Sequence, residues 1–80
     1  MIIYKQGAKK MAKLNYKDLQ AGKIYTDKYG ERVYRYIGRY GAGNLSEFDE
    51  MEYNEEKQDY EPNGNNAILT PVEVEYFSEL

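Results

Sequence analysis

The stretch Arg32-Val33-Tyr34-Arg35-Tyr36-Ile37-Gly38-Arg39-Tyr40 is the clearest secondary-structure signal in the sequence. Apart from one glycine it consists of β-branched, aromatic and arginine residues, a composition that favours a strand. Because side chains alternate along a strand, one face should carry Val33, Arg35, Ile37 and Arg39 and the other Tyr34, Tyr36 and Tyr40. The stretch therefore predicts a long strand over 32–40 and a fold dominated by β-structure.

Segments on the N-terminal side of this strand predict a hairpin. Leu14 to Gly22 suggests one helical turn, for which Asn15 is a possible N-cap, and Gly22 suits a chain reversal. Residues 22–27 resemble a short strand, and the segment from Asp27 to Gly30 has the residues of a turn. We therefore expect strand 22–27 to pair with strand 32–40.

Segments on the C-terminal side extend the meander. The glycines of 41–44 predict a turn before a strand over 45–54. The better core face of this strand is predicted to contain Leu45, Glu47, Asp49, Met51 and Tyr53, opposite Ser46, Phe48, Glu50 and Glu52. A turn at 55–57, a short strand at 58–61 and a strong turn at 62–66 should follow.

The last residues predict a strand over 67–69 and then a short C-terminal helix. Thr70 is a good N-cap, Pro71 suits the first helical position, and Glu73 completes a capping box. A helix would also bring together a stripe of Val72, Tyr76, Phe77 and Leu80. The alternation of Val72-Glu73-Val74-Glu75-Tyr76 fits a strand as well, so this alternative stays open.

These elements place the chain in the α+β class. We expect a small bent antiparallel sheet, or partly open barrel, of four to five strands with a short C-terminal helix. With 80 residues the chain can form only one hydrophobic core. Residues 1–13 are predicted to be a mobile N-terminal arm, and residues 14–80 a single β-rich domain.

Composition argues against catalysis. The chain has no histidine and no cysteine, so it lacks the usual proton carrier near neutral pH, a thiolate nucleophile and the commonest zinc ligands. We expect no catalytic residues, no metal site and no cofactor. No apolar run approaches the length of a membrane span, so we expect a cytoplasmic protein without membrane contact. A non-catalytic binding protein is the resulting interpretation.

Charge is distributed unevenly between the two halves. Residues 1–40 contain ten Lys and Arg against three acids, whereas residues 41–80 contain Lys57 alone against eleven acids. In one interpretation the halves neutralise each other across a sheet. In the other, the acids of 47–61 stay exposed and attract a basic partner.

The second interpretation gives the first functional hypothesis, a stoichiometric inhibitor that acts as a nucleic-acid mimic. An acidic hairpin would occupy the basic groove of a nucleic-acid-binding protein, and two tyrosines would serve as aromatic anchors. The predicted contact residues are Glu47, Asp49, Glu50, Glu52, Tyr53, Glu55, Glu56, Asp59 and Tyr60.

Two alternatives remain open. Interleaved arginines and aromatic rings could bind single-stranded nucleic acid directly, through phosphate contacts and base stacking. The residues of this alternative are Tyr34, Arg35, Tyr36, Arg39 and Tyr40. The acidic pI opposes it, so we rank it second. The other alternative is a structural adaptor or homodimer joined through an exposed strand edge.

Part of the sequence resembles a known type of domain. Asp18-Leu19-Gln20-Ala21-Gly22-Lys23-Ile24-Tyr25, the Tyr29-Gly30 turn and Val33-Tyr34-Arg35-Tyr36 are similar to the opening of Src-homology-3-like barrels. Size, acidity and the lack of Cys and His also resemble small accessory proteins of phages and mobile elements, such as anti-CRISPR and other anti-defence inhibitors. These resemblances imply a Src-homology-3-like β core and inhibition by binding.

Overall fold

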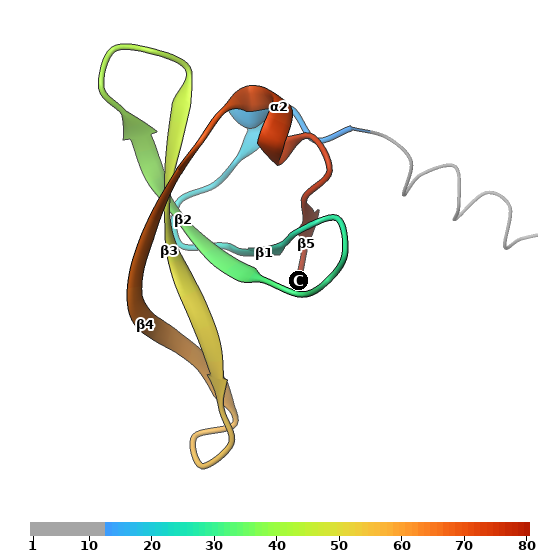
Figure 1. Ribbon diagram of the computed structural model, residues 1–80, viewed down its shortest axis with the longest axis vertical. Helices are drawn as coiled ribbons and strands as arrows, with labels where there is room; N and C mark the ends of the chain where they lie inside the picture. Colours follow the sequence, from blue (N-terminus) through green and yellow to red (C-terminus); the bar gives the residue numbers. More distant parts are fainter. Residues whose placement is uncertain (1–12) are drawn as a thin grey trace, which may run out of the picture.

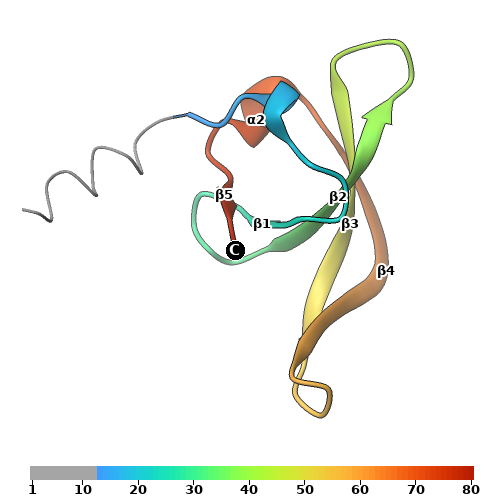
Figure 2. The same ribbon diagram turned by 180° about the vertical axis from the view of Figure 1, so that it is seen from behind.

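The computed structural model describes residues 13–80, which form one open sheet of five antiparallel strands (Figures 1 and 2). The elements in chain order are η1 (Tyr16–Asp18), β1 (Ile24–Thr26), β2 (Val33–Tyr40), β3 (Leu45–Asn54), β4 (Asp59–Leu69), α2 (Pro71–Val74) and β5 (Ser78–Glu79). The strand order in the sheet is β4-β3-β2-β1-β5. This confirms the predicted α+β class, a small bent sheet with a short helix near the C-terminus. Except for Lys13, the predicted N-terminal arm lies outside the described residues.

β2 and β3 form the centre of the sheet, close to their predicted bounds. Their register shifts at Ile37, because Tyr36 pairs with Phe48 while Gly38 pairs with Glu47. Ile37 is therefore an extra residue, and beyond it the alternation of faces reverses. Tyr40 pairs with Leu45 and so faces away from Tyr36. The predicted single face of Tyr34, Tyr36 and Tyr40 is thus wrong for Tyr40.

The hydrophobic core lies on one face of β2 and β3. Its buried members are Leu19, Tyr25, Tyr34, Tyr36, Phe48, Val74 and Phe77. The Phe48 ring is fully buried, with its centre 5.4–5.7 Å from those of Tyr34, Tyr36 and Phe77. The predicted core face of 45–54 is therefore wrong, because Ser46 and Phe48 point into the main core. Met51 is buried on the opposite face, beside its cross-strand neighbours Val33 and Pro62.

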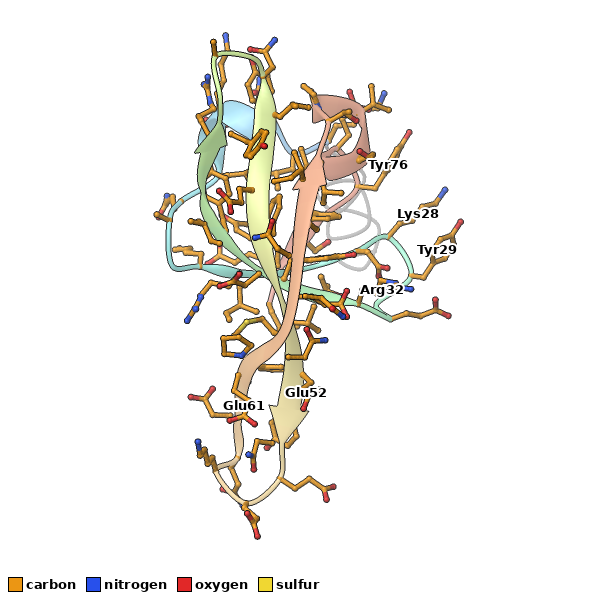
Figure 3. All side chains as sticks on the ribbon, turned by 60° about the vertical axis from the view of Figure 1, so that its left-hand side comes forward. Lys28, Tyr29, Arg32, Glu52, Glu61 and Tyr76 are labelled. Carbon is orange, nitrogen blue, oxygen red and sulfur yellow. The ribbon has the colours of Figure 1, made fainter. Side chains whose placement is uncertain are left out.

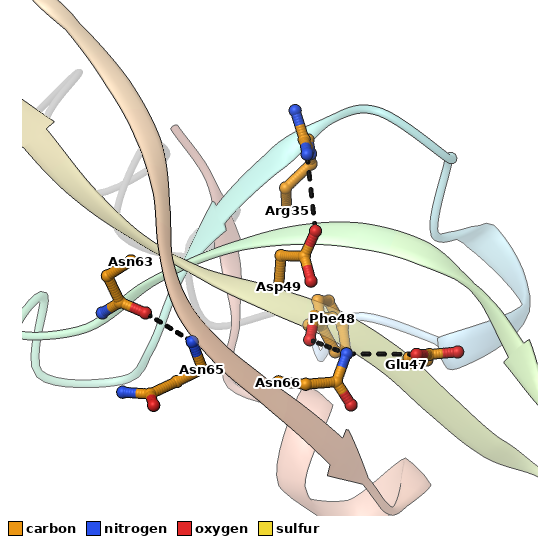
Figure 4. A network of polar contacts seen from close by, with 7 residues as sticks. All are labelled: Arg35, Glu47, Phe48, Asp49, Asn63, Asn65 and Asn66. Atoms are coloured by element: carbon orange, nitrogen blue, oxygen red, sulfur yellow. Dashed lines mark hydrogen bonds and ion pairs between the residues drawn. The ribbon is translucent and has the colours of Figure 1, made fainter.

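β4 continues through the segment that was predicted to be a turn. Asn66 pairs with Asp49 and Pro62 pairs with Met51, so residues 63–65 form a bulge opposite Glu50. Gly64 has a φ of 97° in this bulge, a conformation that a side chain would disfavour. Asn63 accepts a hydrogen bond from the Asn65 amide (2.9 Å; Figure 4) and donates one to Glu50 (2.8 Å). The turn at 62–66 is therefore a wrong prediction, because its turn-forming residues build a bulge inside a strand.

The C-terminal helix begins as predicted but ends sooner. The Thr70 side chain accepts a hydrogen bond from the Glu73 amide, and the Glu73 side chain accepts one from the Thr70 amide, which confirms the capping box. After one turn the chain leaves the helix and adds β5 to β1. The helical stripe of the longer helix does not form, because three of its members, Tyr76, Phe77 and Leu80, lie beyond α2. Val74 is the fully buried residue of α2, and Val72, Tyr76 and Leu80 are exposed.

The buried hydroxyl of Ser46 leads to a stability prediction. Its oxygen has no hydrogen-bond partner among residues 13–80, although the residue is fully buried. Because an unpaired buried hydroxyl is unfavourable, Ser46→Ala should raise the free energy of unfolding by about 1 kcal/mol. Urea denaturation followed by circular dichroism measures this change. Ser78→Ala, at an exposed serine, is the control, and a loss of stability in Ser46→Ala would contradict the prediction.

Candidate functional site

The far ends of β3 and β4 project away from the rest of the sheet and form what we call the β3–β4 arm, residues 51–62 (Figure 1). The connecting turn spans residues 55–58, because Asn54 and Asp59 are the last cross-strand pair. The Asn54 side chain accepts a hydrogen bond from the Lys57 amide (3.1 Å). Gln58 completes the turn with a φ of 53°. Local hydrogen bonding and one left-handed residue thus shape the tip.

The two faces of the arm differ in chemistry. Tyr53 pairs with Tyr60 across the strands, and their rings meet edge to face with centres 5.2 Å apart. Tyr53 is half exposed, so the ring pair is accessible. Glu52 lies on the opposite face, directly across from Glu61. The arm therefore presents an aromatic pair on one face and carboxylates on the other.

Several predicted contact carboxylates are already bonded within the protein. Asp49 pairs with Arg35 (3.4 Å), and Glu47 accepts a hydrogen bond from Asn66 (3.1 Å) (Figure 4). Glu50 pairs with Arg32 (3.3 Å) in addition to its bond with Asn63. Asp59 accepts a hydrogen bond from the neighbouring Tyr60 amide. These acids help to hold the sheet together and are less available to a partner.

Ion pairs join the two oppositely charged halves of the chain. Of the five ion pairs among residues 13–80, four join a cation of the basic half to a carboxylate of the acidic half. The fifth joins Lys57 to Glu61 within the arm (3.2 Å). These pairs fit the interpretation in which the two halves of the chain neutralise each other.

Three carboxylates at the end of the arm remain outside this pairing. Glu52, Glu55 and Glu56 are exposed and form no ion pair or side-chain hydrogen bond with the described chain. They lie on the same projecting hairpin as the Tyr53–Tyr60 pair. Of the nine predicted contact residues, the structure thus groups these three acids with two tyrosines and Asp59 on the arm. Glu47, Asp49 and Glu50 lie farther along β3, toward the core.

The alternative nucleic-acid surface is not assembled. Tyr34 and Tyr36 are only 8% and 7% exposed, so their rings cannot stack on bases. Arg35 pairs with Asp49 on the outer face of the sheet. Because of the bulge at Ile37, Arg39 lies on the other face, 5.1 Å from the Tyr16 ring centre. The two arginines therefore lie on different faces, and of the three predicted tyrosines only Tyr40 is exposed.

The longer of the two edge strands, which a homodimer would require, is β4, since β5 has only two residues. β4 is an edge strand of the sheet and is 11 residues long. Pro62 and the bulge at 63–65 interrupt it, and both features discourage pairing with another strand. The structure thus has an exposed strand edge at β4, but this edge is not a long, regular strand.

Glu50 and Glu61 make the stability of the β3–β4 strand pair sensitive to acid. Hydrogen bonds from Asn63 and Asn65 and the nearby Arg32 guanidinium lower the pKa of Glu50 below its ordinary value of 4.5, against the effect of desolvation. Hydrogen bonds from Asn54 and Lys57 likewise lower the pKa of Glu61. A depressed folded-state pKa adds stability above the ordinary carboxyl value, and that stability is lost as the pH falls through the folded pKa.

Glu50→Gln should therefore reduce the loss of stability between about pH 6 and about pH 3. Urea denaturation at several pH values measures this dependence. Glu55→Gln, at a carboxylate without bonds to the described chain, serves as the control and should leave the dependence as in the wild type. An equal acid sensitivity in Glu50→Gln and the wild type would refute the role assigned to Glu50.

The sequence did not reveal an apolar groove near the turn between β1 and β2. Tyr29, Tyr34, Val72 and Tyr76 are among the residues that line it. Tyr29 was assigned only to a turn, whereas Val72 and Tyr76 were assigned to a helical stripe. Val72 and Tyr76 come together with the 27–30 turn because β5 pairs with β1, and the sequence contains no local signal for that pairing.

Neither a metal site nor a membrane-spanning helix among residues 13–80, nor a match to a known protein, indicates another function. Among residues 13–80 no group of three acidic side chains is placed to hold a metal ion. No helix in this part of the chain is long and apolar enough to cross a membrane. Comparisons with protein-family models, with curated proteins and with solved structures found no match to this chain.

Proposed function

We propose that the protein is a non-catalytic, stoichiometric inhibitor whose β3–β4 arm occupies the basic groove of a nucleic-acid-handling protein. The observation that carries this proposal is the group of unbonded carboxylates, Glu52, Glu55 and Glu56, on a projecting hairpin that also carries the partly exposed Tyr53–Tyr60 pair. Because the partner handles nucleic acid, we place the interaction in the cytoplasm.

Electrostatics on the arm support a role in binding rather than in folding. Glu52 and Glu61 are direct cross-strand neighbours, and like charges in that position destabilise a sheet by roughly 0.2–1 kcal/mol. Lys57 and Asn54 bond to Glu61 and relieve part of this repulsion, whereas Glu52 has no such bond within the described chain. A partner's lysine or arginine would remove the remaining cost. The arm thus gains more from a basic surface than a neutral hairpin would.

The tyrosine pair would convert long-range attraction into a lasting complex. Exposed carboxylates mainly raise the association rate, whereas buried aromatic anchors mainly slow dissociation. Tyr53 and Tyr60 already hold each other edge to face, so little side-chain entropy is lost when a partner covers them. We therefore expect charge variants to change the association rate and tyrosine variants to change the dissociation rate.

Nucleic-acid-handling proteins of host defence are the first partners to test, because the sequence resembles phage and mobile-element inhibitors of the anti-CRISPR type. A fluorescently labelled nucleic acid is bound to the purified defence protein, and the inhibitor is titrated while anisotropy is recorded. We expect displacement that is complete near equimolar inhibitor. Weak displacement that needs a large excess would contradict stoichiometric inhibition.

A matched pair of variants tests whether the arm is responsible. Glu55→Gln with Glu56→Gln should weaken displacement by roughly tenfold at low salt, because two steering charges are lost. Asp18→Asn with Glu31→Gln changes net charge equally at exposed acids outside the arm and should act as the wild type. Equal effects of the two pairs would show that net charge, and not the arm, drives binding.

A further inference from the structure

The apolar groove lies between the β1–β2 turn and the segment that contains α2. It has a volume of about 370 Å³, and Tyr29, Tyr34, Leu69, Val72, Tyr76 and Phe77 supply its apolar lining. Tyr29, Val72 and Tyr76 are 73%, 66% and 48% exposed, so these three large side chains form its open walls. Tyr34 and Phe77 are buried, and their rings stack with centres 5.3 Å apart. A stacked aromatic base with exposed walls is suited to a flat apolar side chain.

Both walls of the groove are held in place before any ligand binds. In the β1–β2 turn, Asp27 accepts backbone hydrogen bonds from Gly30 (3.1 Å) and, through its side chain, from Glu31 (2.9 Å). On the other wall, the capping box between Thr70 and Glu73 fixes the first turn of α2. These bonds hold Tyr29 and Val72 in exposed positions, and a preformed site loses little entropy when it is filled.

The rim of the groove carries charge as well as aromatic rings. Asp27 and Glu73 line the groove together with Lys28. The Lys28 ammonium lies 5.6 Å from the Tyr29 ring centre and 5.1 Å from the Tyr76 ring centre (Figure 3). Lys28 forms no ion pair within residues 13–80, so the rings already hold a cation of the protein itself. With two carboxylates against one lysine, the rim has a net negative formal charge that complements a basic ligand.

We propose that this groove is a second contact site for the basic partner of the β3–β4 arm. It binds a basic peptide segment of that partner, with an aromatic side chain in the groove and lysine or arginine side chains beside Asp27 and Glu73. The inference rests on the proposed function, because the arm defines the partner as basic. The groove adds an aromatic requirement, which distinguishes such a segment from a merely cationic surface.

The absence of tryptophan from the chain provides a direct test. The probe is the acetylated and amidated pentapeptide Lys-Lys-Trp-Lys-Lys, whose indole is then the only one in the sample. We expect its emission to shift to shorter wavelength in a saturable way as protein is added, because the indole leaves water. The peptide Ser-Ser-Trp-Ser-Ser should bind at least about tenfold more weakly without its cations.

Variants at exposed groove residues show whether the emission shift arises from binding in the groove. Tyr29→Ser with Tyr76→Ser should abolish the emission shift, and Val72→Lys should do the same by placing a like charge in the groove. Both changes are at exposed positions, and circular dichroism checks that the fold is kept. Glu55→Gln with Glu56→Gln should leave the emission shift at saturation unchanged.

The outcomes separate the groove from the arm. An absent shift, or a shift that persists in both groove variants, overturns the groove proposal and leaves the displacement assay of the arm untouched. A shift lost in the groove variants but kept in the arm variant supports the groove site, even if the arm variant displaces nucleic acid as well as the wild type.

Discussion

Phe48→Ala is expected to lower the free energy of unfolding by about 3–5 kcal/mol, the usual cost of truncating a fully buried phenylalanine. Phe48 is 0% exposed and contacts the rings of Tyr34, Tyr36 and Phe77. The substitution loses both buried apolar area and three aromatic contacts. A domain with a single small core has no further packed layer that could shift to fill the cavity. A domain of this length has a total stability of about 4–12 kcal/mol, so this substitution removes a large share of it.

Urea denaturation followed by far-ultraviolet circular dichroism measures this effect. Tyr40→Ala is the control, because Tyr40 is an aromatic residue of the neighbouring strand that is 51% exposed. Its change should stay within about 0.5 kcal/mol, as at most surface positions. If Phe48→Ala and Tyr40→Ala were equally stable, the core described for this sheet would be wrong.

Features that depend on neighbouring residues were predicted well. The Asn15 cap, in which the side chain accepts a hydrogen bond from the Lys17 amide, and the Thr70–Glu73 capping box each involve residues at most three positions apart. The bounds of β2 and β3 also follow from uninterrupted runs of strand-forming residues between glycine-rich or polar turns. Local chemistry is sufficient in these cases, because the decisive contacts lie within the segment itself.

Features that depend on a partner strand were not predictable in the same way. Pro62 to Asn66 has the composition of a turn, but Glu50 on β3 binds Asn63 and lets β4 continue past the bulge. Likewise, counting apolar residues placed Leu45 and Met51 in the core, whereas the ring of Phe48 meets three other rings on the opposite face. In both cases the outcome is decided by residues far away in the sequence.

The sequence predicts which types of residue form the candidate site, but not which individual residues are available to a partner. The sequence identifies the acids of 47–61 as a group, yet only the folded structure shows that Asp49 and Glu50 form ion pairs with Arg35 and Arg32. The same register places Arg35 and Arg39 on different faces, through one extra residue at Ile37. A single-residue shift reverses every later side chain of a strand, so periodicity alone cannot assign a surface.

Reversing three charges on the arm should have the largest effect on binding. In the variant Glu52→Lys, Glu55→Lys, Glu56→Lys, each contact with the partner's basic groove changes from attraction to repulsion. At roughly 1 kcal/mol for each exposed pair, the affinity should fall by at least about 100-fold. The fold should persist and even gain stability, because a lysine at position 52 would face Glu61 instead of repelling it.

Salt and a matched control distinguish this mechanism from a general charge effect. Salt screens exposed charges, so it should weaken the wild-type complex and relieve the repulsion in the reversed variant, bringing their affinities together. Asp18→Lys, Glu31→Lys, Glu79→Lys changes the net charge equally outside the arm, at the cost of one exposed ion pair with Lys23. Isothermal titration calorimetry at low and high salt measures all three proteins. If both triple variants lost affinity alike, the partner would be sensing net charge, whereas a loss confined to the arm variant identifies the unbonded carboxylates as the contact.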